Sequence, residues 1–179
     1  MKALVVYGTR WGGTTAVAHK IGETIEAAGY EVDVVDAKKK PPRVDEYDLI
    51  VVGSGIRADC WTKEAMKFIE RNAQPLRQKK TALFVCCQMA DGKAEAQEKA
   101  KGNYLLRVAA KYDLKPISYG FFGAYMDFKK SHGLVVDIIV RVNRKRLRAR
   151  GLDTRKIYDT RNWDSITAWA RDIANNASQ

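Results

Sequence analysis

Residues 6–16 read VYGTRWGGTTA, so a short apolar run passes directly into a loop of hydroxyl, arginine and glycine residues. Hydroxyl groups and arginine donate hydrogen bonds to an anion, and adjacent glycines let the backbone approach it closely. A helix that begins within this loop adds free N–H groups and the positive end of its dipole. The pattern predicts a cradle for one phosphate group, formed by Thr9, Arg10, Trp11, Gly12, Gly13 and Thr14.

The loop lacks the spacing of the two common glycine-rich phosphate motifs. Neither G-x-x-x-x-G-K-[ST], typical of nucleoside triphosphate loops, nor G-x-G-x-x-G, typical of dinucleotide sites, is present. A mononucleotide phosphate is therefore the better prediction. The alternative is an ordinary tight turn between a strand and a helix, with no ligand.

Five short apolar runs indicate the strands that position this loop. They are continuous rather than alternating, which is typical of strands buried on both faces of a parallel sheet. Stretches with helical spacing separate them, so we expect right-handed crossovers, an α/β fold and ligand-binding loops at the carboxyl edge of the sheet. The runs are 3–7, 32–35, 49–52, 82–87 and 117–122.

Capping residues predict where several helices begin and end. We expect a first helix from about Thr14 to Gly29, and a cap for the second helix at Thr62. A last helix is expected to begin near Asn162, with residues 175–179 frayed. At 179 residues, the chain is expected to form a single domain.

Composition narrows the classes of partner and of site. The net charge of +11 favours an acidic protein or an anionic membrane surface, whereas nucleic acid fits poorly because stacking aromatic residues are not interleaved with the basic ones. No apolar run approaches the roughly 18 to 20 residues that cross a bilayer, and no signal-peptide pattern is present, so we expect a cytoplasmic protein. The three cysteines and two histidines have no metal-ligand spacing, so we expect reduced thiols and no metal site.

Residues 127–151 are expected to form a basic insertion. They contain eight basic and two acidic residues, a net +6 of the total +11. Apolar residues follow helical spacing at Val135, Ile138, Ile139 and Val142, which predicts an amphipathic helix with a basic end. Two interpretations remain open: a docking element for an anionic membrane or an acidic redox partner, or an insertion packed on the sheet edge with a solvated charged face.

The segments GTRWGGTT, GSGIR and DTRK carry a resemblance to a known family. Thr9, Gly12 and Thr14 match the phosphate loop of flavodoxins, with Trp11 where a threonine is usual. All three segments resemble in pattern the loops of the flavodoxin-like, menaquinone-dependent protoporphyrinogen oxidases, so the chain is similar to flavodoxins and closest to that branch. The resemblance covers nearly the whole chain. It implies a five-stranded parallel sheet in the order 2-1-3-4-5, helices on both faces, and an insertion in the region of the fifth strand.

The resemblance also implies a cofactor, flavin mononucleotide (FMN), held by three loops. The first binds the phosphate, the second lies beside the ring with a carbonyl of Gly55 or Ile56 near N5, and the third lies on the pyrimidine side. Many flavodoxins stack aromatic residues on the ring, but this chain has none at those places, which leaves Trp11, Trp61, Tyr125 or a partner subunit of a homodimer to cover it. The residues implied in the second and third loops are Ser54, Gly55, Ile56, Arg57, Cys86, Cys87, Gln88 and Met89.

Two functions follow from this resemblance. We favour an electron carrier of the flavodoxin type, whose partner would be an acidic, ferredoxin-like redox protein. The alternative is an enzyme that dehydrogenates protoporphyrinogen IX and passes electrons to a quinone at a membrane surface, where the chain would bind peripherally. No constellation for general-base catalysis lies near the expected site, so no catalytic residue is assigned. A phosphate-binding protein that kept the fold without a flavin is a third interpretation.

Overall fold

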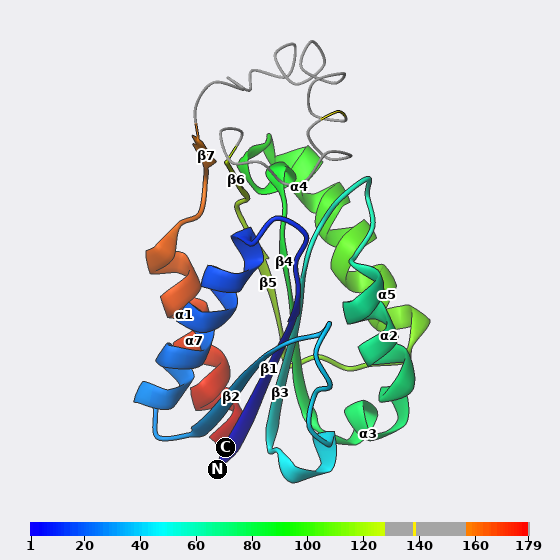
Figure 1. Cartoon of the computed structure of the whole chain (residues 1–179), viewed down its shortest axis with the longest axis vertical. Coiled ribbons are helices and arrows are strands. Elements are labelled where there is room, and N and C mark those ends of the chain that lie inside the picture. The colour runs from blue at the N-terminus through cyan, green and yellow to red at the C-terminus, as the bar shows by residue number, and fades with distance from the viewer. Residues whose placement is uncertain (128–137, 139–156, 179) are drawn as a thin grey trace.

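The computed structural model describes residues 1–127, 138 and 157–178. Within them, five parallel strands form one sheet in the order β2-β1-β3-β4-β5, which confirms the predicted fold (Figure 1). Every strand begins or ends within about two residues of the apolar run that predicted it. The strands are β1 (Lys2–Gly8), β2 (Glu31–Asp36), β3 (Leu49–Gly55), β4 (Lys80–Cys86) and β5 (Ser118–Phe122).

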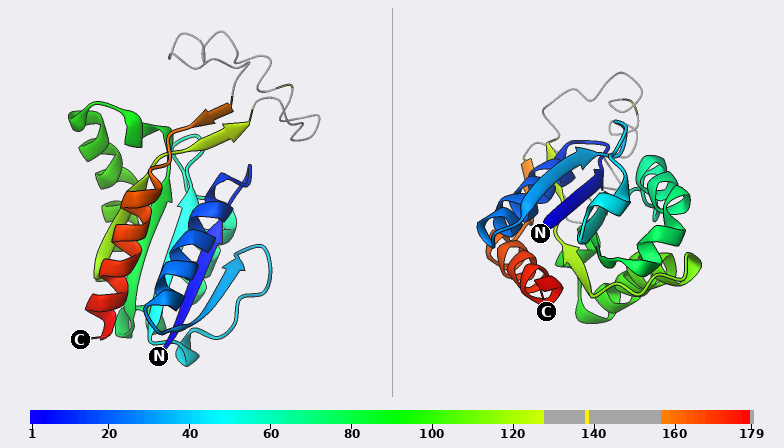
Figure 2. Two further views of the ribbon diagram at one scale, coloured as in Figure 1. Left: turned by 90° about the vertical axis from the view of Figure 1, so that its left-hand side faces the viewer. Right: turned by 90° about the horizontal axis from the view of Figure 1, so that it is seen from below.

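Helices cover both faces of this sheet. Figure 2 shows α1 (Gly13–Ala27) and α7 (Trp163–Ser178) together on one face. The other face is covered by α2, α4 and α5, with α3 at its lower end. These elements are α2 (Lys63–Arg71), α3 (Ala73–Gln78), α4 (Ala94–Lys101), the π-helical turn η3 (Gly102–Leu106) and α5 (Arg107–Lys111); the short 3₁₀ turns are η1 (Val44–Glu46) and η2 (Gln88–Asp91).

The continuous apolar runs are explained by burial on both faces. In β1, Leu4 and Val6 pack toward α2, whereas Ala3 and Val5 pack toward α1 and α7, and all four are fully buried. Alternate side chains of a strand point to opposite faces, so a strand covered on both sides needs apolar residues at every position.

The predicted helix ends are confirmed, with one correction. After α1, Gly29 adopts φ +94°, and the N–H groups of Gly29 and Tyr30 donate to carbonyls of the last turn, as in a Schellman cap. Thr62 Oγ1 accepts from the N–H of Ala65 and caps α2. The expected fraying is wrong for residues 175–178, because α7 continues to Ser178 and the carbonyl of the buried Ala177 accepts from Lys80 Nζ at 3.0 Å.

A small antiparallel sheet follows β5. It pairs β6 (Tyr125–Asp127) with β7 (Ile157–Asp159), so Asp127 lies opposite Ile157. The two residues that flank the segment 128–156 are therefore paired with each other. The expected helix and the basic residues of the insertion at 127–151 lie outside the described residues. Of that insertion, only Asp127 and Ile138 are described. None of the helices in the described part of the chain is both long and apolar enough to cross a membrane.

Candidate functional site

Three predicted loops meet at the carboxyl edge of the sheet. Gly55 pairs with Cys86 across β3 and β4, and the Ile56 N–H donates to the Cys86 carbonyl at 3.0 Å. Thr14, at the start of α1, brings the first loop next to the second. A Cβ added at Gly55 would lie only 2.8 Å from Thr14 Oγ1. The structure thus brings together residues that are far apart in sequence, at the edge where parallel α/β sheets bind ligands.

The first loop has the geometry of an anion cradle. Gly12 stands at the N-terminus of α1 with φ +81°, and its N–H donates to Thr9 Oγ1 at 3.0 Å. No side chain caps α1, and its first turn has no acidic residue, so no carboxylate of that turn competes for its N–H groups. Arg10 is exposed and Trp11 half-exposed beside them.

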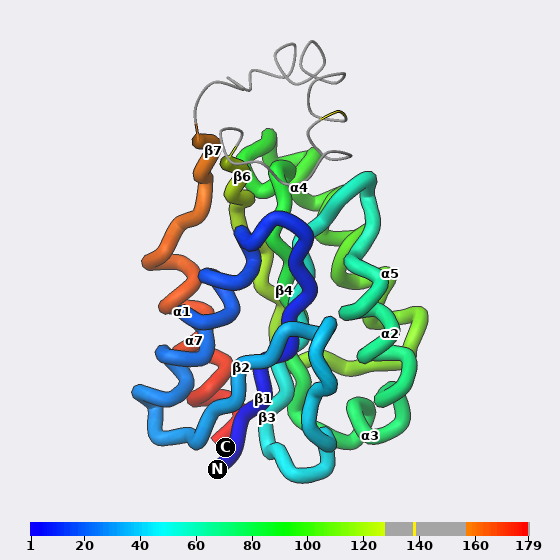
Figure 3. Tube along the Cα trace, viewed as in Figure 1, coloured from blue at the N-terminus to red at the C-terminus, as the bar shows by residue number. Residues whose placement is uncertain are grey.

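The two adjacent glycines serve different purposes. Gly12 has open space around its Cα and is required for its positive φ, which other residues adopt at a cost. Gly13 has an ordinary φ, but a Cβ there would lie 3.0 Å from the Tyr125 carbonyl oxygen and 3.1 Å from the Tyr125 Cβ. Gly13 therefore allows β6 to pack against the first loop, as the backbone trace shows (Figure 3).

In the second loop, Ser54 has a structural role. Its side chain is fully buried, its hydroxyl donates to the Gly55 carbonyl at 3.0 Å, and it accepts from the Thr62 N–H at 2.9 Å. The peptide between Gly55 and Ile56 is consequently bonded at both its C=O and its N–H. Turning this carbonyl toward a ligand would break both hydrogen bonds, whereas the half-buried side chains of Ile56 and Arg57 are available there.

The second loop then reverses in a tight turn. The backbones of Arg57 and Cys60 exchange two hydrogen bonds, at 3.0 and 3.1 Å. Between them, Ala58 and Asp59 adopt φ +48° and +58°, the pattern of a type I′ turn. Glycine and asparagine usually occupy such positions, so this turn holds an alanine in a left-handed conformation that it rarely adopts.

Two of the four predicted residues of the third loop have buried side chains. Cys86 and Cys87 are buried in the two cores on opposite faces of the sheet. Burial raises the pKa of Cys86 to about 12 and that of Cys87 to about 11, so both thiols are protonated at neutral pH. Gln88 is half-buried, with Nε2 3.8 Å from Met126 Sδ, and Met89 is exposed. Of these four side chains, only Gln88 and Met89 can therefore meet a ligand at the surface.

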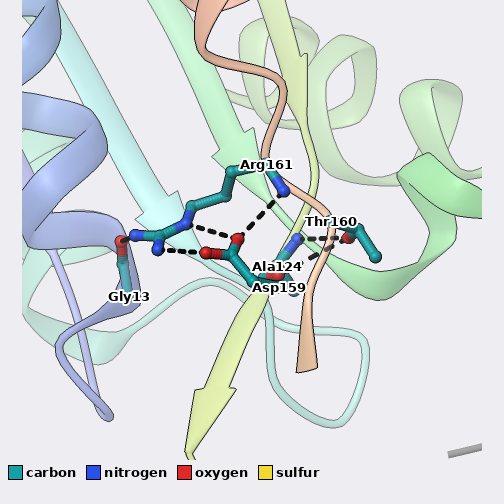
Figure 4. Close-up of polar contacts among 5 residues, drawn as sticks. All are labelled: Gly13, Ala124, Asp159, Thr160 and Arg161. Carbon is teal, nitrogen blue, oxygen red and sulfur yellow. Dashed lines mark hydrogen bonds and ion pairs between the residues drawn. The ribbon is translucent and has the colours of Figure 1, made fainter. Parts of the chain in front are cut away.

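Arg161 reaches the site although sequence analysis did not select it. Its Nε and Nη2 donate to the Asp159 carboxylate at 2.8 and 2.6 Å, and Nη1 lies 3.5 Å from the Gly13 carbonyl (Figure 4). The guanidinium stacks on Tyr125 and Trp163, 4.4 and 4.7 Å from the ring centroids. A side chain that is only 9% exposed thus links the end of β7 to the phosphate loop.

A repeated tripeptide was the available signal for Arg161. The sequence DTRKIYDTRNW contains Asp-Thr-Arg twice, at 153–155 and at 159–161. The motif DTRK, on which the resemblance is based, contains the first copy, and this copy lies outside the described residues. Arg161 of the second copy makes the contacts with Asp159 and Gly13. Thr160 within it exchanges backbone and hydroxyl hydrogen bonds with Ala124, which fixes the end of β7 to the end of β5 (Figure 4).

Two of the three aromatic candidates for covering a ring are engaged elsewhere. Trp61 is 8% exposed and donates from Nε1 to the Tyr104 carbonyl at 2.7 Å, so it belongs to the core. The ring of Tyr125 carries the guanidinium of Arg161. Trp11 lies within the first loop and is half-exposed.

Comparison with known proteins gives consistent matches. A family model described as a flavodoxin domain matches residues 4–130. Protoporphyrinogen IX dehydrogenase [quinone] of Escherichia coli strain K12 is 21% identical over 178 residues, which span 97% of this chain and 95% of that protein. Among solved structures, a flavodoxin from the domain Archaea has 18% identity and a TM-score of 0.59, with both chains covered in full. A flavoprotein in complex with FMN from Lactobacillus acidophilus has 16% identity and a TM-score of 0.50, over 67% of this chain and 92% of that chain. At such identities, the structural matches establish a common fold.

Proposed function

The chain belongs to the flavodoxin family, and from this we propose that it binds FMN and transfers electrons between redox partners. The observation that carries the proposal is the uncapped N-terminus of α1, with Gly12 at φ +81° and no acidic residue in the first turn. A phosphate dianion fits such a terminus, because the N–H groups and the helix dipole both favour negative charge.

The rest of the edge fits a flavin ring. The ring would lie across the second and third loops, between the half-buried Ile56 and Arg57 and the exposed Met89. FMN when bound supplies the redox chemistry, and the protein sets its binding and its potential. Arg57 places a permanent positive charge on the ring side of the site, while the protonated thiols of Cys86 and Cys87 supply no charge.

We further propose that electrons pass to an acidic partner. A net charge of +11 attracts acidic proteins and raises the rate of encounter, and this effect falls as salt increases. The proposed basic insertion at 127–151 carries more than half of that charge, within a single domain of residues 1–179. Cytoplasmic location, peripheral membrane association and a homodimer belong to the same proposal.

A matched pair of variants tests the phosphate cradle. Asn and Asp both tolerate the left-handed conformation of Gly12, and a Cβ there meets no neighbour, so the two differ only in charge. We expect Gly12→Asp to bind FMN about 10- to 100-fold more weakly than Gly12→Asn, because the carboxylate repels the phosphate. Riboflavin, which has no phosphate, should bind both variants equally. Dissociation constants from fluorescence titration measure both effects.

The same substitutions at Gly29 provide the control. Gly29 also has positive φ and open space, but it lies at the other end of α1. Its Asn and Asp variants should bind FMN alike. Equal FMN affinities for the two Gly12 variants would contradict the placement of the phosphate, and a wild-type protein that binds no FMN would contradict the proposed function.

The match to protoporphyrinogen IX dehydrogenase [quinone] favours a second candidate function. It covers 97% of this chain and 95% of the relative, so no large part of either chain lacks a counterpart. For the carrier that we favour, we expect rapid reduction by a ferredoxin system and negligible porphyrin fluorescence when protoporphyrinogen IX and a quinone are supplied. Rapid formation of porphyrin that depends on the quinone would reverse this order.

A further inference from the structure

Tyr104 makes two contacts with the second loop. It lies in the π-helical turn η3 between α4 and α5, and it is 5% exposed. Its hydroxyl donates to Asp59 Oδ1 at 2.5 Å, and its backbone carbonyl accepts from Trp61 Nε1 at 2.7 Å. One residue thus bonds to the turn and to the residue that follows it. A π-helical turn is an uncommon feature within a helix, and it often accompanies functional sites.

The turn needs such support. Ala58 and Asp59 both have positive φ, and alanine has no side chain that could offset the cost of this conformation. Backbone in sparsely populated regions persists only where its surroundings hold it. The Asp59 carboxylate is fixed by Tyr104, and Trp61 is buried against the same helix.

The tip of this turn also has backbone groups without a hydrogen bond to another described residue. The Gly55–Ile56 peptide is bonded on both sides, and the backbones of Arg57 and Cys60 bond to each other. Among the described residues, no protein group bonds to the peptide that joins Ala58 and Asp59. This peptide can therefore present its C=O or N–H to a ligand at the edge of the loop.

We propose that Tyr104 is a positioning residue of the flavin site. Through Asp59 and Trp61 it holds the turn from Arg57 to Cys60 in its left-handed form, and so sets how the loop meets the flavin ring. This inference rests on the proposed function for the identity of the ligand. The effect on the turn itself belongs to the protein alone and can be measured without flavin.

Tyr47 provides a matched control for Tyr104→Phe. Its hydroxyl donates to Asp33 Oδ2 at 2.6 Å, another buried tyrosine bonded to an aspartate, but it lies two residues before β3 begins, away from the carboxyl edge. Both Phe variants lose one such hydrogen bond, so they should lose similar thermal stability. Only Tyr104→Phe should change the second loop.

The first measurement is hydrogen exchange in the flavin-free protein. The N–H groups of Arg57 and Cys60 bond across the turn. We expect these two amides to exchange at least about 10-fold faster in Tyr104→Phe, and at an unchanged rate in Tyr47→Phe. The second measurement is binding. FMN and riboflavin should both bind Tyr104→Phe about 5- to 30-fold more weakly, by the same factor, because the ring is affected and the phosphate is not. The midpoint potentials of the bound flavin should also shift in this variant alone.

Variants of Asp59 separate positioning from folding. Asp59→Asn keeps the acceptor and tolerates positive φ, so it should behave as wild type in exchange. Asp59→Ala removes the same hydrogen bond and places a second alanine at positive φ, so its turn should exchange at least as fast as that of Tyr104→Phe. The double variant should be no worse than Asp59→Ala, because the two changes remove one shared interaction. If Tyr104→Phe fails to fold, Asp59→Ala still decides the question.

Unchanged exchange of the Arg57 and Cys60 amides in both Tyr104→Phe and Asp59→Ala would overturn the inference, whether or not flavin binds. Flavin affinities equal to those of a flavin-binding wild type would also overturn it. A wild type that binds no FMN would instead refute the proposed function, and the exchange result would still show whether Tyr104 holds the turn.

Discussion

Replacing Gly8 with alanine is expected to lower the free energy of unfolding by about 3 to 4 kcal/mol. Gly8 is the last residue of β1, and it pairs with Ser54 of β3. A Cβ at this position would overlap Thr62 Oγ1 and lie 3.0 Å from the Ala65 Cβ. The first turn of α2 would have to move away from the sheet.

The cost is large because Thr62 has several bonds to lose. It is 2% exposed, its hydroxyl caps α2, and its N–H donates to Ser54 Oγ. Losing the cap costs about 1 kcal/mol, and depriving the buried Ser54 oxygen and the Thr62 N–H of their mutual hydrogen bond costs about 1 to 3 kcal/mol more. The same movement loosens the Gly55 carbonyl, to which Ser54 donates.

Urea unfolding of the flavin-free protein, followed by circular dichroism, measures this cost. Gly102→Ala is the matched control, since Gly102 has helical φ and open space around its Cα. Alanine there should stabilise the protein by about 0.5 to 1 kcal/mol. A free energy of unfolding for Gly8→Ala within about 1 kcal/mol of the wild-type value would contradict the packing of β1 against α2.

Removing the guanidinium of Arg161 should have the second largest effect. Arg161→Leu loses two bonds to Asp159, the contact with the Gly13 carbonyl, and stacking on Tyr125 and Trp163. We expect the free energy of unfolding to fall by about 2 to 3 kcal/mol. This is less than the loss of a fully buried ion pair would cost, because Asp159 is 36% exposed and water can solvate it. Arg43→Leu is the control: Arg43 pairs with Asp45 two positions away, but the side chains are 80% and 59% exposed, so its loss should cost less than about 0.5 kcal/mol.

The stability lost in Arg161→Leu should depend on pH. Hydrogen bonds from Arg161 hold the pKa of Asp159 below its ordinary value of 3.8. A carboxyl whose pKa is lowered by folding stabilises the protein above the ordinary pKa, and that contribution disappears as pH falls through the folded value. The difference between wild type and Arg161→Leu should therefore be full at pH 7 and narrow below pH 3.8. A constant difference across this range would show that the ion pair contributes nothing.

The sheet and the meeting of its loops were predictable because the relevant signals are local. Continuous apolar runs mark strands buried on two faces, and Gly29 and Thr62 mark helix ends through their own backbone and hydroxyl chemistry. The role of Ser54 was accessible too. Side chains alternate along a strand, so Ser54 shares the face of Ile50 and Val52, against which α2 packs.

The contacts of Arg161 and Tyr104 were not accessible in this way. Arg161 meets Gly13 across 148 positions, and Tyr104 meets Asp59 across 45. Neither pairing follows from propensity or periodicity, because each depends on how distant elements are finally docked. The positive φ of Ala58 is of the same kind, since alanine gives no local signal for a left-handed turn.

The link between Gly13 and Arg161 has a consequence for how the protein is made. The phosphate loop is among the first segments to be synthesised, but its buried cation follows 148 residues later, and α7, which packs beside α1, comes later still. A nascent chain on the ribosome therefore presents the cradle without the residues that brace it. We therefore expect the proposed binding of FMN to follow translation, because the two ends of the chain must first meet to brace this loop.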